Sequence, residues 1–281
     1  MTNLRVLNLG AGVQSTTIYL MMLDGDIPPA DIAIFADTQD EPHEVYDHLE
    51  RLKALRGIEI VTVTAGSLGD NLINGVNSTG QRHVPIPTFL SLEDNGKNDG
   101  IGRRQCTKEY KVVPIEKEIR RRLDCTGRPV PKGTTVTQVF GLSFDEPGRV
   151  ARVKGLYDHR KGWVAEFPLF DDFLTRDDCK AYLAKRWPHP VPRSACVFCP
   201  YRSDAEWLEM KLRDETSWKR AVEIDGKVRD ETSACQRGMR AKQYLHRSCQ
   251  PLELVQLQAS PTDRQKRISY SQMDCEGMCG V

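Results

Sequence analysis

The chain has 281 residues, of which 39% are hydrophobic and 28% are charged, and its formal net charge is +1. This composition is typical of a globular protein with a large core, and the length suits one large α/β domain or a core domain with a smaller addition. The near-neutral charge gives no argument for nucleic-acid binding from bulk electrostatics. No apolar run reaches the roughly 18 residues of a membrane span, and the first residues lack a secretory signal pattern. We therefore expect no membrane partner and a cytoplasmic location.

The cysteine content favours metal or redox chemistry. Nine cysteines in a chain of this length, without a signal pattern, suggest a reducing compartment. An odd number also makes a complete disulfide framework an unlikely outcome, so thiols are expected to act as ligands or reactants.

Strands and helices alternate near the amino terminus. Apolar runs predict strands over residues 5–9, 31–36 and 59–64, and helical patterns cover residues 15–23 and 41–55. This alternation predicts a parallel sheet with helices packed on it. The carboxyl ends of such strands meet at one edge, where ligands bind in sheets of this kind.

The remaining elements follow less regularly. The sequence predicts, in chain order, a long loop over residues 75–102, a basic helix over 106–123, strands over 135–142 and 163–167, a helix over 175–187 capped by Thr175, and a charged helical region over 203–244. The fold class is therefore α/β, with a Rossmann-like parallel sheet flanked by helices over residues 1–170. A helical cysteine-bearing region with a carboxy-terminal tail is expected over residues 171–281.

A glycine turn lies between the first strand and the first helix. Glycine allows a positive φ and lets a phosphate approach backbone N–H groups, and a helix amino terminus adds partial positive charge. The turn is neither a Walker A loop nor a complete dinucleotide fingerprint, and a tight turn without a ligand is the alternative. The candidate nucleotide-binding residues are Gly10, Ala11, Gly12, Val13, Gln14 and Ser15.

An acidic loop follows the second strand at the same edge. Asp37 and Thr38 begin it, and a carboxylate there could bind a ribose hydroxyl or a magnesium ion that carries phosphates. The alternative is that this loop only caps the next helix.

A basic segment combines cations with a thiol. Arg104, Cys106, Lys108 and Lys111 lie within it, and the i, i+3 spacing of the two lysines predicts a shared helix face. Cations there would suit phosphate or sulfate and would lower the pKa of a nearby thiol. A solvated basic face is the alternative. The arginine run at residues 120–122 is typical of such a face, so no function is assigned to it.

A Cys-x-x-Cys-Pro motif is the strongest single signal. Cys196 and Cys199 have the spacing that clasps a tetrahedral metal or one corner of an iron–sulfur cluster. Cys106, Cys275 and Cys279 supply further thiols, and spacing alone does not separate zinc from iron–sulfur. The alternative is a buried structural pair.

Several segments together resemble one family, the phosphoadenylyl-sulfate (PAPS) reductases of the adenine-nucleotide α-hydrolase superfamily, which also holds the N-type ATP pyrophosphatases. In chain order these segments are Gly12-Val-Gln14, Asp37-Thr38 with Pro42 and Glu44, residues 106–114, Phe167-Pro-Leu169, Ser194-Ala-Cys196-x-x-Cys199 and the terminal Met278-Cys279-Gly280-Val281. Two departures stand out: Gln105-Cys106 replaces two adjacent cysteines, and the tail ends in Cys-Gly-Val.

The resemblance implies an enzyme of adenine-nucleotide-dependent sulfur chemistry, either a PAPS reductase-like oxidoreductase or an ATP-dependent sulfurtransferase. Residues 1–170 would bind PAPS, APS or ATP, with Mg²⁺ as a further candidate ion. Cys279 would be the nucleophile, and Arg104, Lys108 and Lys111 would stabilise charge on the phosphate. A 4Fe-4S cluster would be held by Cys106, Cys196, Cys199 and Cys275.

Partners and alternatives follow from the same resemblance. A thiol, a protein reductant or a sulfur donor is expected as partner, and nucleic acid is an acceptor in the thiolation version. In that version ATP adenylates the acceptor and pyrophosphate is released. A third reading is a non-catalytic, zinc-stabilised module that binds nucleotide or nucleic acid. Cys275 and Cys279 could also both be metal ligands.

Overall fold

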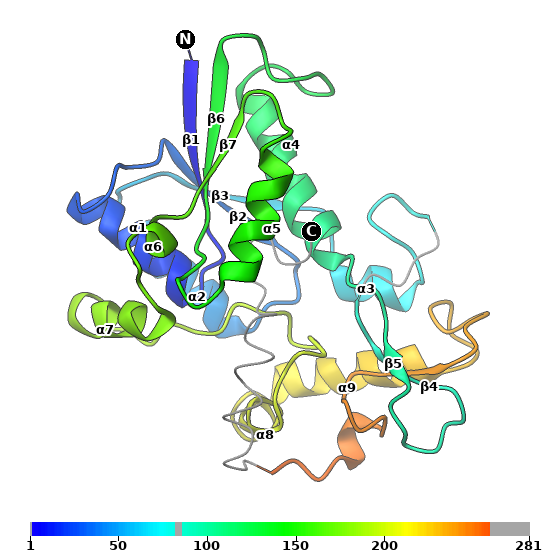
Figure 1. Cartoon of the computed structure of the whole chain (residues 1–281). Coiled ribbons are helices and arrows are strands. Elements are labelled where there is room, and N and C mark those ends of the chain that lie inside the picture. Colours follow the sequence, from blue (N-terminus) through cyan, green and yellow to red (C-terminus); the bar gives the residue numbers. More distant parts are fainter. Residues whose placement is uncertain (1, 82–85, 259–281) are drawn as a thin grey trace.

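The structure is a computed structural model that describes residues 2–81 and 86–258 (Figure 1). A five-stranded sheet of order β3-β2-β1-β6-β7 forms its centre, and every neighbouring pair in it is parallel. The strands are β1 (Thr2–Asn8), β2 (Ile32–Asp37), β3 (Ile60–Thr64), β6 (Thr134–Val139) and β7 (Trp163–Glu166). The predicted α/β fold with a parallel, Rossmann-like sheet is confirmed.

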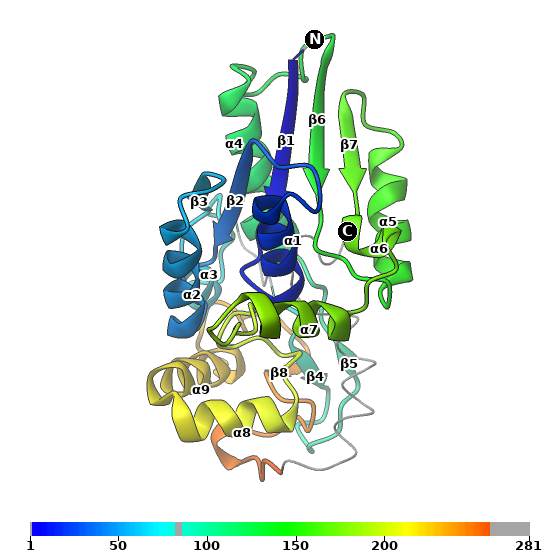
Figure 2. The ribbon, with the colours of Figure 1, turned by 90° about the vertical axis from the view of Figure 1, so that its left-hand side faces the viewer.

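Helices cover both faces of this sheet, and the alternation of side chains along each strand explains why. In β2, Ala33 and Phe35 join one buried cluster, whereas Ile32 and Ile34 join the other. The first cluster packs against α1 (Val13–Asp24), α2 (His43–Ala54) and α7 (Arg176–Arg186), and the second against α4 (Val113–Arg122) and α5 (Pro147–Tyr157). Figure 2 shows the sheet with α1 and α7 in front of it.

The strand order creates a switch point beside β1. The chain moves from β1 to β2 on one side and later returns to β6 on the other side of β1. In open parallel sheets, ligands bind outside the carboxyl ends of the strands at such a point. The end where these strands finish is called the carboxyl edge below, and the end where they begin is called the amino edge. Residues 10–15, 37–42 and 140–146 follow β1, β2 and β6 at the carboxyl edge.

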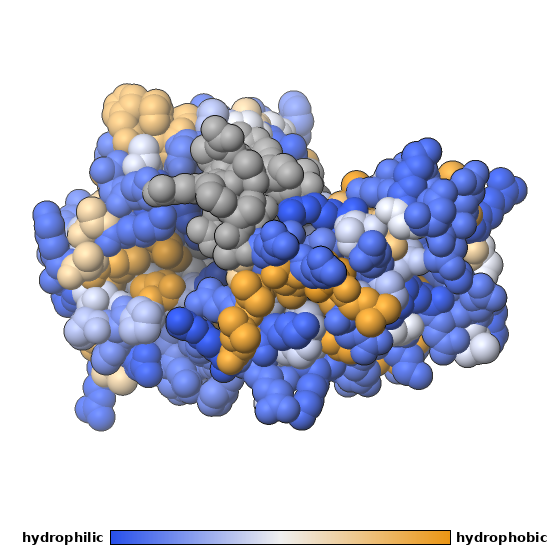
Figure 3. Space-filling model, turned by 90° about the horizontal axis from the view of Figure 1, so that it is seen from below, coloured by the Kyte–Doolittle hydropathy of each residue, from blue (hydrophilic) through white to orange (hydrophobic). Residues whose placement is uncertain are grey.

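A smaller group of elements lies below the carboxyl edge in Figure 1. It consists of α3 (Leu68–Ile73), α8 (Asp204–Arg213), α9 (Glu215–Arg229) and an antiparallel sheet of β4 (Phe89–Ser91), β5 (Gly100–Ile101) and β8 (Lys242–Tyr244). Trp207 and Ile224 are fully buried in its core. Seen from below, the surface is mostly hydrophilic with a band of hydrophobic residues across it (Figure 3).

Several local predictions were wrong. The predicted loop over residues 75–102 contains β4 and β5, and the predicted helical region over 203–244 ends in β8. These strands have two or three residues, too few to show a period, and β8 pairs with β4 about 150 residues away, a contact that local sequence does not encode. The sequence did not predict α5, which precedes β7, or α6 (Pro168–Asp171), which follows it. It also did not predict the 3₁₀ turn at Leu252–Leu254.

The core below the sheet draws residues from both sides of position 170. Leu68, Tyr110 and Ile86 pack there with Phe198 and Leu245. The division at residue 170 therefore stays a prediction. In the described part of the chain, no helix is both long and apolar enough to cross a membrane.

Candidate functional site

The glycine turn between β1 and α1 is buried at the carboxyl edge. Its left-handed residue is Ala11, with a φ of 56°, whereas Gly12 has a φ of −104°. The expected positive φ thus falls on the alanine between the glycines. The Ser15 hydroxyl accepts hydrogen bonds from the N–H groups of Gly10 at 3.2 Å and Gly12 at 3.3 Å. The N–H groups of the first turn of α1 have no acceptor within the helix, so they are the groups that could hold a phosphate.

The loop after β6 comes directly against this turn. A Cβ placed on Gly141 would lie 2.9 Å from the backbone nitrogen of Ser15. That separation is shorter than any ordinary contact between such atoms, and both atoms belong to backbone. Only glycine therefore allows the two loops of the switch point to approach this closely.

A buried polar network links the same two loops. The Gln14 side-chain amide donates to Ser143 Oγ at 3.0 Å and to Glu146 Oε2 at 2.7 Å. Glu146 also forms a buried ion pair with Arg149, and Arg176 Nη1 donates to Gln14 Oε1 at 2.9 Å. Sequence reasoning named Gln14 but missed the four other members of this network, which are Ser143, Glu146, Arg149 and Arg176. The sequence offered one signal for them: Ser143, Glu146 and Arg149 follow a predicted strand, at the edge where ligands bind.

Asp37 lies at the end of β2 and organises the turn that follows. Its Oδ1 accepts hydrogen bonds from the N–H of Gln39 at 2.7 Å and from the Tyr46 hydroxyl at 2.9 Å. Burial, reinforced by the Asp37 carboxylate, raises the pKa of Tyr46 well above its usual range. Tyr46 therefore stays a neutral donor, and Oδ2 of Asp37 makes no hydrogen bond to any described residue.

A buried cluster of a threonine, a carboxylate, a lysine and a thiol lies next along this loop. Lys111 Nζ is 3.3 Å from Glu41 Oε1, and their side chains are 4% and 0% exposed. Thr38 Oγ1 is 3.2 Å from the sulfur of Cys196 and 3.5 Å from Glu41 Oε1. The same carboxylate oxygen lies 4.0 Å from the Cys196 sulfur. Two predicted site residues, Lys111 and Cys196, thus meet at the carboxyl end of β2.

A π-helical turn brings Lys111 into this cluster. The predicted helix over residues 106–123 begins with the π-helix Lys108–Val112 and continues as α4. Its wider turn leaves Lys108 exposed, whereas Lys111 is buried. The two lysines therefore do not share a face, contrary to the expectation from i, i+3 spacing in an α-helix. Burial raises the pKa of the neighbouring Tyr110 to about 12, and its hydroxyl accepts from Asn71 Nδ2 at 2.9 Å.

Asp40 connects the carboxyl edge with the elements below it. Its Oδ2 accepts from the N–H of Gly69 at 2.7 Å, and its Oδ1 accepts from Arg220 Nε at 3.2 Å. Its backbone carbonyl accepts from the N–H of Val197 at 2.8 Å. Burial raises the pKa of Asp40, against the opposing effects of these donors. Asp40 therefore joins α3, α9 and the Cys-x-x-Cys segment to the sheet.

The Cys-x-x-Cys segment is a turn held at its backbone. The N–H of Cys199 donates to the carbonyl of Cys196 at 3.0 Å. Arg202 Nη2 donates to the carbonyls of Ala195 at 2.9 Å and Cys196 at 3.2 Å. Cys106, Cys196 and Cys199 are all half-buried, and Cys106 and Cys196 pack against the same core cluster.

Three of the predicted metal ligands, Cys106, Cys196 and Cys199, lie in the described part of the chain. Among residues 2–81 and 86–258, no three histidine, cysteine or carboxylate side chains come close enough to hold a metal ion. Cys275 and Cys279 lie outside the described residues. The described thiols thus do not make a cluster site by themselves, and no chemical step is derived through an iron–sulfur cluster.

Arg104 occupies a different position from the two lysines of the basic segment. Its guanidinium lies 5.3 Å from the ring centroid of Tyr201, just after the Cys-x-x-Cys turn. It is half-buried there. This contact ties the basic segment to the thiol segment.

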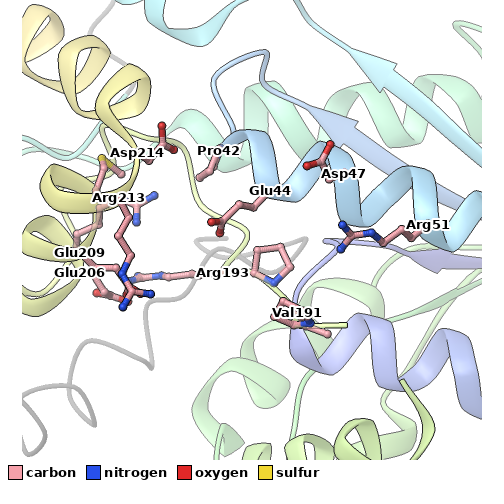
Figure 4. Close-up of a pocket in the computed structure, with 14 residues that line it drawn as sticks. Pro42, Glu44, Asp47, Arg51, Val191, Arg193, Glu206, Glu209, Arg213 and Asp214 are labelled. Atoms are coloured by element: carbon pink, nitrogen blue, oxygen red, sulfur yellow. The ribbon is translucent and has the colours of Figure 1, made fainter. Parts of the chain in front are cut away.

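A cavity of about 590 Å³ is lined by residues of α2 and α8 and by residues on either side of the Cys-x-x-Cys turn (Figure 4). Arg193 and Arg202 line it near the turn, between α2 on one side and α8 on the other. Burial alone would raise the pKa of Glu206, but Arg193 and the Ser203 N–H hold it at about 2. Charges of both signs line the cavity, so its lining does not favour an anionic ligand.

Comparisons with known proteins show a likeness to a solved structure. No family model and no curated protein matches the chain. Among solved structures, it is similar to a phosphoadenylyl-sulfate (PAPS) reductase from Candida auris in a phosphate complex, with 17% sequence identity and a TM-score of 0.36. The match covers 68% of this chain and 74% of that one.

Proposed function

We propose that the chain is an enzyme that binds an adenine nucleotide at the switch point and carries out sulfur chemistry on it. The observation that supports this most directly is the sharing of one sheet edge. The glycine turn follows β1, and the Cys196 thiol lies against the loop that follows the neighbouring strand β2. Amides that could hold a phosphate and a thiol segment next to the buried Glu41–Lys111 pair suit sulfur chemistry on a nucleotide-linked group.

Three groups receive roles in nucleotide binding. The first-turn amides of α1 would hold a phosphate. Arg176 contacts the turn through Gln14 and would add positive charge beside it. Asp37 Oδ2 would accept from a ribose hydroxyl or bind a magnesium ion. The predicted roles of Arg104 and Lys108 in binding phosphate stay proposals.

The sulfur step proposed for a phosphosulfate substrate uses two thiols. The thiolate of Cys279 would attack the sulfur atom, so that a new S–S bond forms and the S–O bond to the phosphate breaks. The adenosine phosphate leaves with the bonding electrons, and sulfonate stays on the cysteine. A second thiol, from a small thiol or a protein reductant, would then attack the cysteine sulfur. Sulfite leaves, and the two thiols end as a disulfide.

Lys111 receives a positioning role in this proposal. Its charge is already matched by Glu41 at 3.3 Å, and both side chains are buried. The pair fixes the oxygen that Thr38 and Cys196 contact. Lys111 would therefore orient the thiol segment through Glu41, and the phosphate would be stabilised by the amides and by Arg176.

The nucleotide site is tested by Gly141→Ala. The added Cβ would lie 2.9 Å from the Ser15 nitrogen and force the two loops apart. We expect calorimetric affinity for PAPS, APS or ATP to fall by more than tenfold, or about 1.4 kcal/mol. Gly148→Ala is the matched control, because no atom outside its chain neighbours and the backbone of its own helix lies within 4 Å of its Cβ position. Equal affinity of both folded variants for all three nucleotides would reject this site.

The sulfur step is tested by Cys279→Ser in anaerobically purified protein. We expect nucleotide affinity to persist while release of sulfite is lost. Iron and zinc are measured in the same samples, because Cys106, Cys196, Cys199 and Cys275 stay predicted ligands. Sulfite release by Cys279→Ser at the parent rate would refute the nucleophile, and release of pyrophosphate from ATP would favour the thiolation reaction instead.

A further inference from the structure

A basic depression lies at the amino edge of the sheet, at the opposite end of the strands from the proposed nucleotide site. Its volume is about 560 Å³, and it is formed by the last turn of α4, the loop that leads to β6 and the turn before β7. Its lining consists of Arg120, Gly127, Arg128, Pro129, Val130, Arg160, Lys161 and Trp163. Four of these side chains are cationic and none is acidic.

An indole ring holds two of the cations in place. The guanidinium of Arg160 lies 4.3 Å from the centroid of the Trp163 ring, and that of Arg120 lies 5.5 Å from it. Trp163 is buried by this packing and begins β7. The two guanidinium groups are therefore ordered by the fold before any ligand arrives, which reduces the entropy lost on binding.

Most of this positive charge has no carboxylate beside it. Arg160 is paired with Glu116 at 2.8 Å. Within residues 2–81 and 86–258, Arg120, Arg128 and Lys161 form no ion pair; Arg120 donates to the Arg128 carbonyl, and Arg128 to the Asp124 carbonyl at 2.6 Å. A carbonyl accepts a hydrogen bond without neutralising the charge. Three uncompensated cations thus surround one concavity in a chain whose net charge is only +1.

We propose that this depression binds the phosphodiester backbone of a nucleic acid. Guanidinium groups match phosphate oxygens in a planar fork, and cations without carboxylate partners lose no ion pair when a phosphate arrives. The arginine run at residues 120–122, which sequence reasoning assigned to a solvated face, supplies one of the cations. Arg121 and Arg122 are instead paired with Glu118.

The distribution of the cations favours a polymer over a single phosphate. They come from three separate segments, and the exposed Lys132 extends the same loop. A chain of phosphates can contact several of them at once. The six residues of β6 place the depression about 20 Å from the carboxyl edge, so a mononucleotide held at the switch point does not reach it. The depression is therefore a separate site that would tether the nucleic acid.

The test measures binding of the full chain to a 20-nucleotide RNA and to a 20-base-pair DNA duplex by fluorescence anisotropy between 20 and 200 mM salt, without adenine nucleotide. We expect each lost phosphate contact to reduce the log–log salt slope by about 0.7 for the single strand and 0.9 for the duplex. Arg128→Ala with Lys161→Ala should therefore lower affinity at 100 mM salt at least tenfold. Arg128→Lys should keep the parent slope.

Lys219→Ala is the matched control, because Lys219 is an exposed cation on α9 that is paired with Glu215 at 2.7 Å. It should bind as the parent does. An unchanged slope and affinity in the double variant would overturn the proposal. The absence of oligonucleotide binding at 20 mM salt would also overturn the proposal. This holds even if inorganic phosphate alone stabilises the parent and not the double variant. The assay contains no PAPS, APS or ATP, so its outcome is independent of the proposed function.

Discussion

Charged side chains are buried in ion pairs at one edge of the central sheet and exposed without ion-pair partners among the described residues at the other. At the carboxyl edge, Glu41 with Lys111 and Glu146 with Arg149 are buried ion pairs inside hydrogen-bonded networks. At the amino edge, cations such as Arg128 and Lys161 face solvent and form no ion pair with a described residue. A net charge of +1 therefore hides an uneven distribution of charge between the two edges. Buried pairs fix geometry for chemistry, whereas outward cations are available for a ligand.

The largest loss in the free energy of unfolding is expected at the buried Glu41–Lys111 pair. Lys111→Met would leave the fully buried Glu41 carboxylate without this cation. Breaking a buried pair on one side costs about 3–5 kcal/mol, because the remaining charge stays desolvated after its close counter-charge is removed. We expect a loss of that size in the free energy of unfolding measured with urea.

The control for this variant is a Lys–Glu pair that is largely open to solvent, with side chains 33% and 69% exposed. Lys53 lies 2.7 Å from Glu50 on α2, and Lys53→Met should cost no more than about 1 kcal/mol. Lys111→Met combined with Glu41→Gln should recover part of the loss, because the buried charge is then removed as well. A loss below 1 kcal/mol in Lys111→Met would mean that the two edges do not differ in this way.

A second prediction uses pH, because a titratable base is buried between α1 and α2. His48 is fully buried in α2, and its Nε2 is 2.9 Å from Thr16 Oγ1. Burial, with smaller contributions from Arg51 and His189, lowers its pKa from 6.5 to about 4. The unfolded chain takes up a proton near pH 6.5, whereas the folded chain resists it until about pH 4.

The stability that neutral His48 contributes is therefore complete above pH 6.5 and is lost as the pH falls towards 4. The expected total is roughly 3 kcal/mol. His48→Gln should remove this part of the pH dependence of unfolding, and His43→Gln, at an exposed position of the same helix, should not. Equal slopes in both variants between pH 6.5 and 4 would contradict the assignment.

Local sequence predicted the elements whose signals are local. The apolar runs gave the strands of the parallel sheet, and Thr175 was predicted as the cap of α7. Its Oγ1 indeed accepts from the N–H of Asp178 at 3.2 Å. The glycine turn was also found at its expected place, because a strand, a turn and a helix are read from neighbouring residues.

The features that sequence reasoning missed depend on distant contacts. Arg176 contacts Gln14, which lies 162 residues away in the sequence. Lys111 contacts Glu41 because of a π-helical turn, and the sequence pattern does not predict such a turn. The basic depression was missed for the same reason. Arg120 belongs to a run that reads as a solvated helix face, and only the fold brings Arg160 and Trp163 beside it.

The smallest expected effect concerns the stability of the amino edge. Arg128 and Lys161 are exposed, and among the described residues the one side-chain hydrogen bond that either makes is that of Arg128 to the Asp124 carbonyl. Arg128→Ala with Lys161→Ala should therefore change the free energy of unfolding by no more than about 0.5 kcal/mol, as surface changes of this kind usually do. Relief of repulsion between neighbouring cations favours the double variant slightly at low salt. Urea unfolding at 20 and 200 mM salt measures this. A loss above 1 kcal/mol would show that these cations hold the fold together, and the contrast with the buried pairs of the carboxyl edge would then fail.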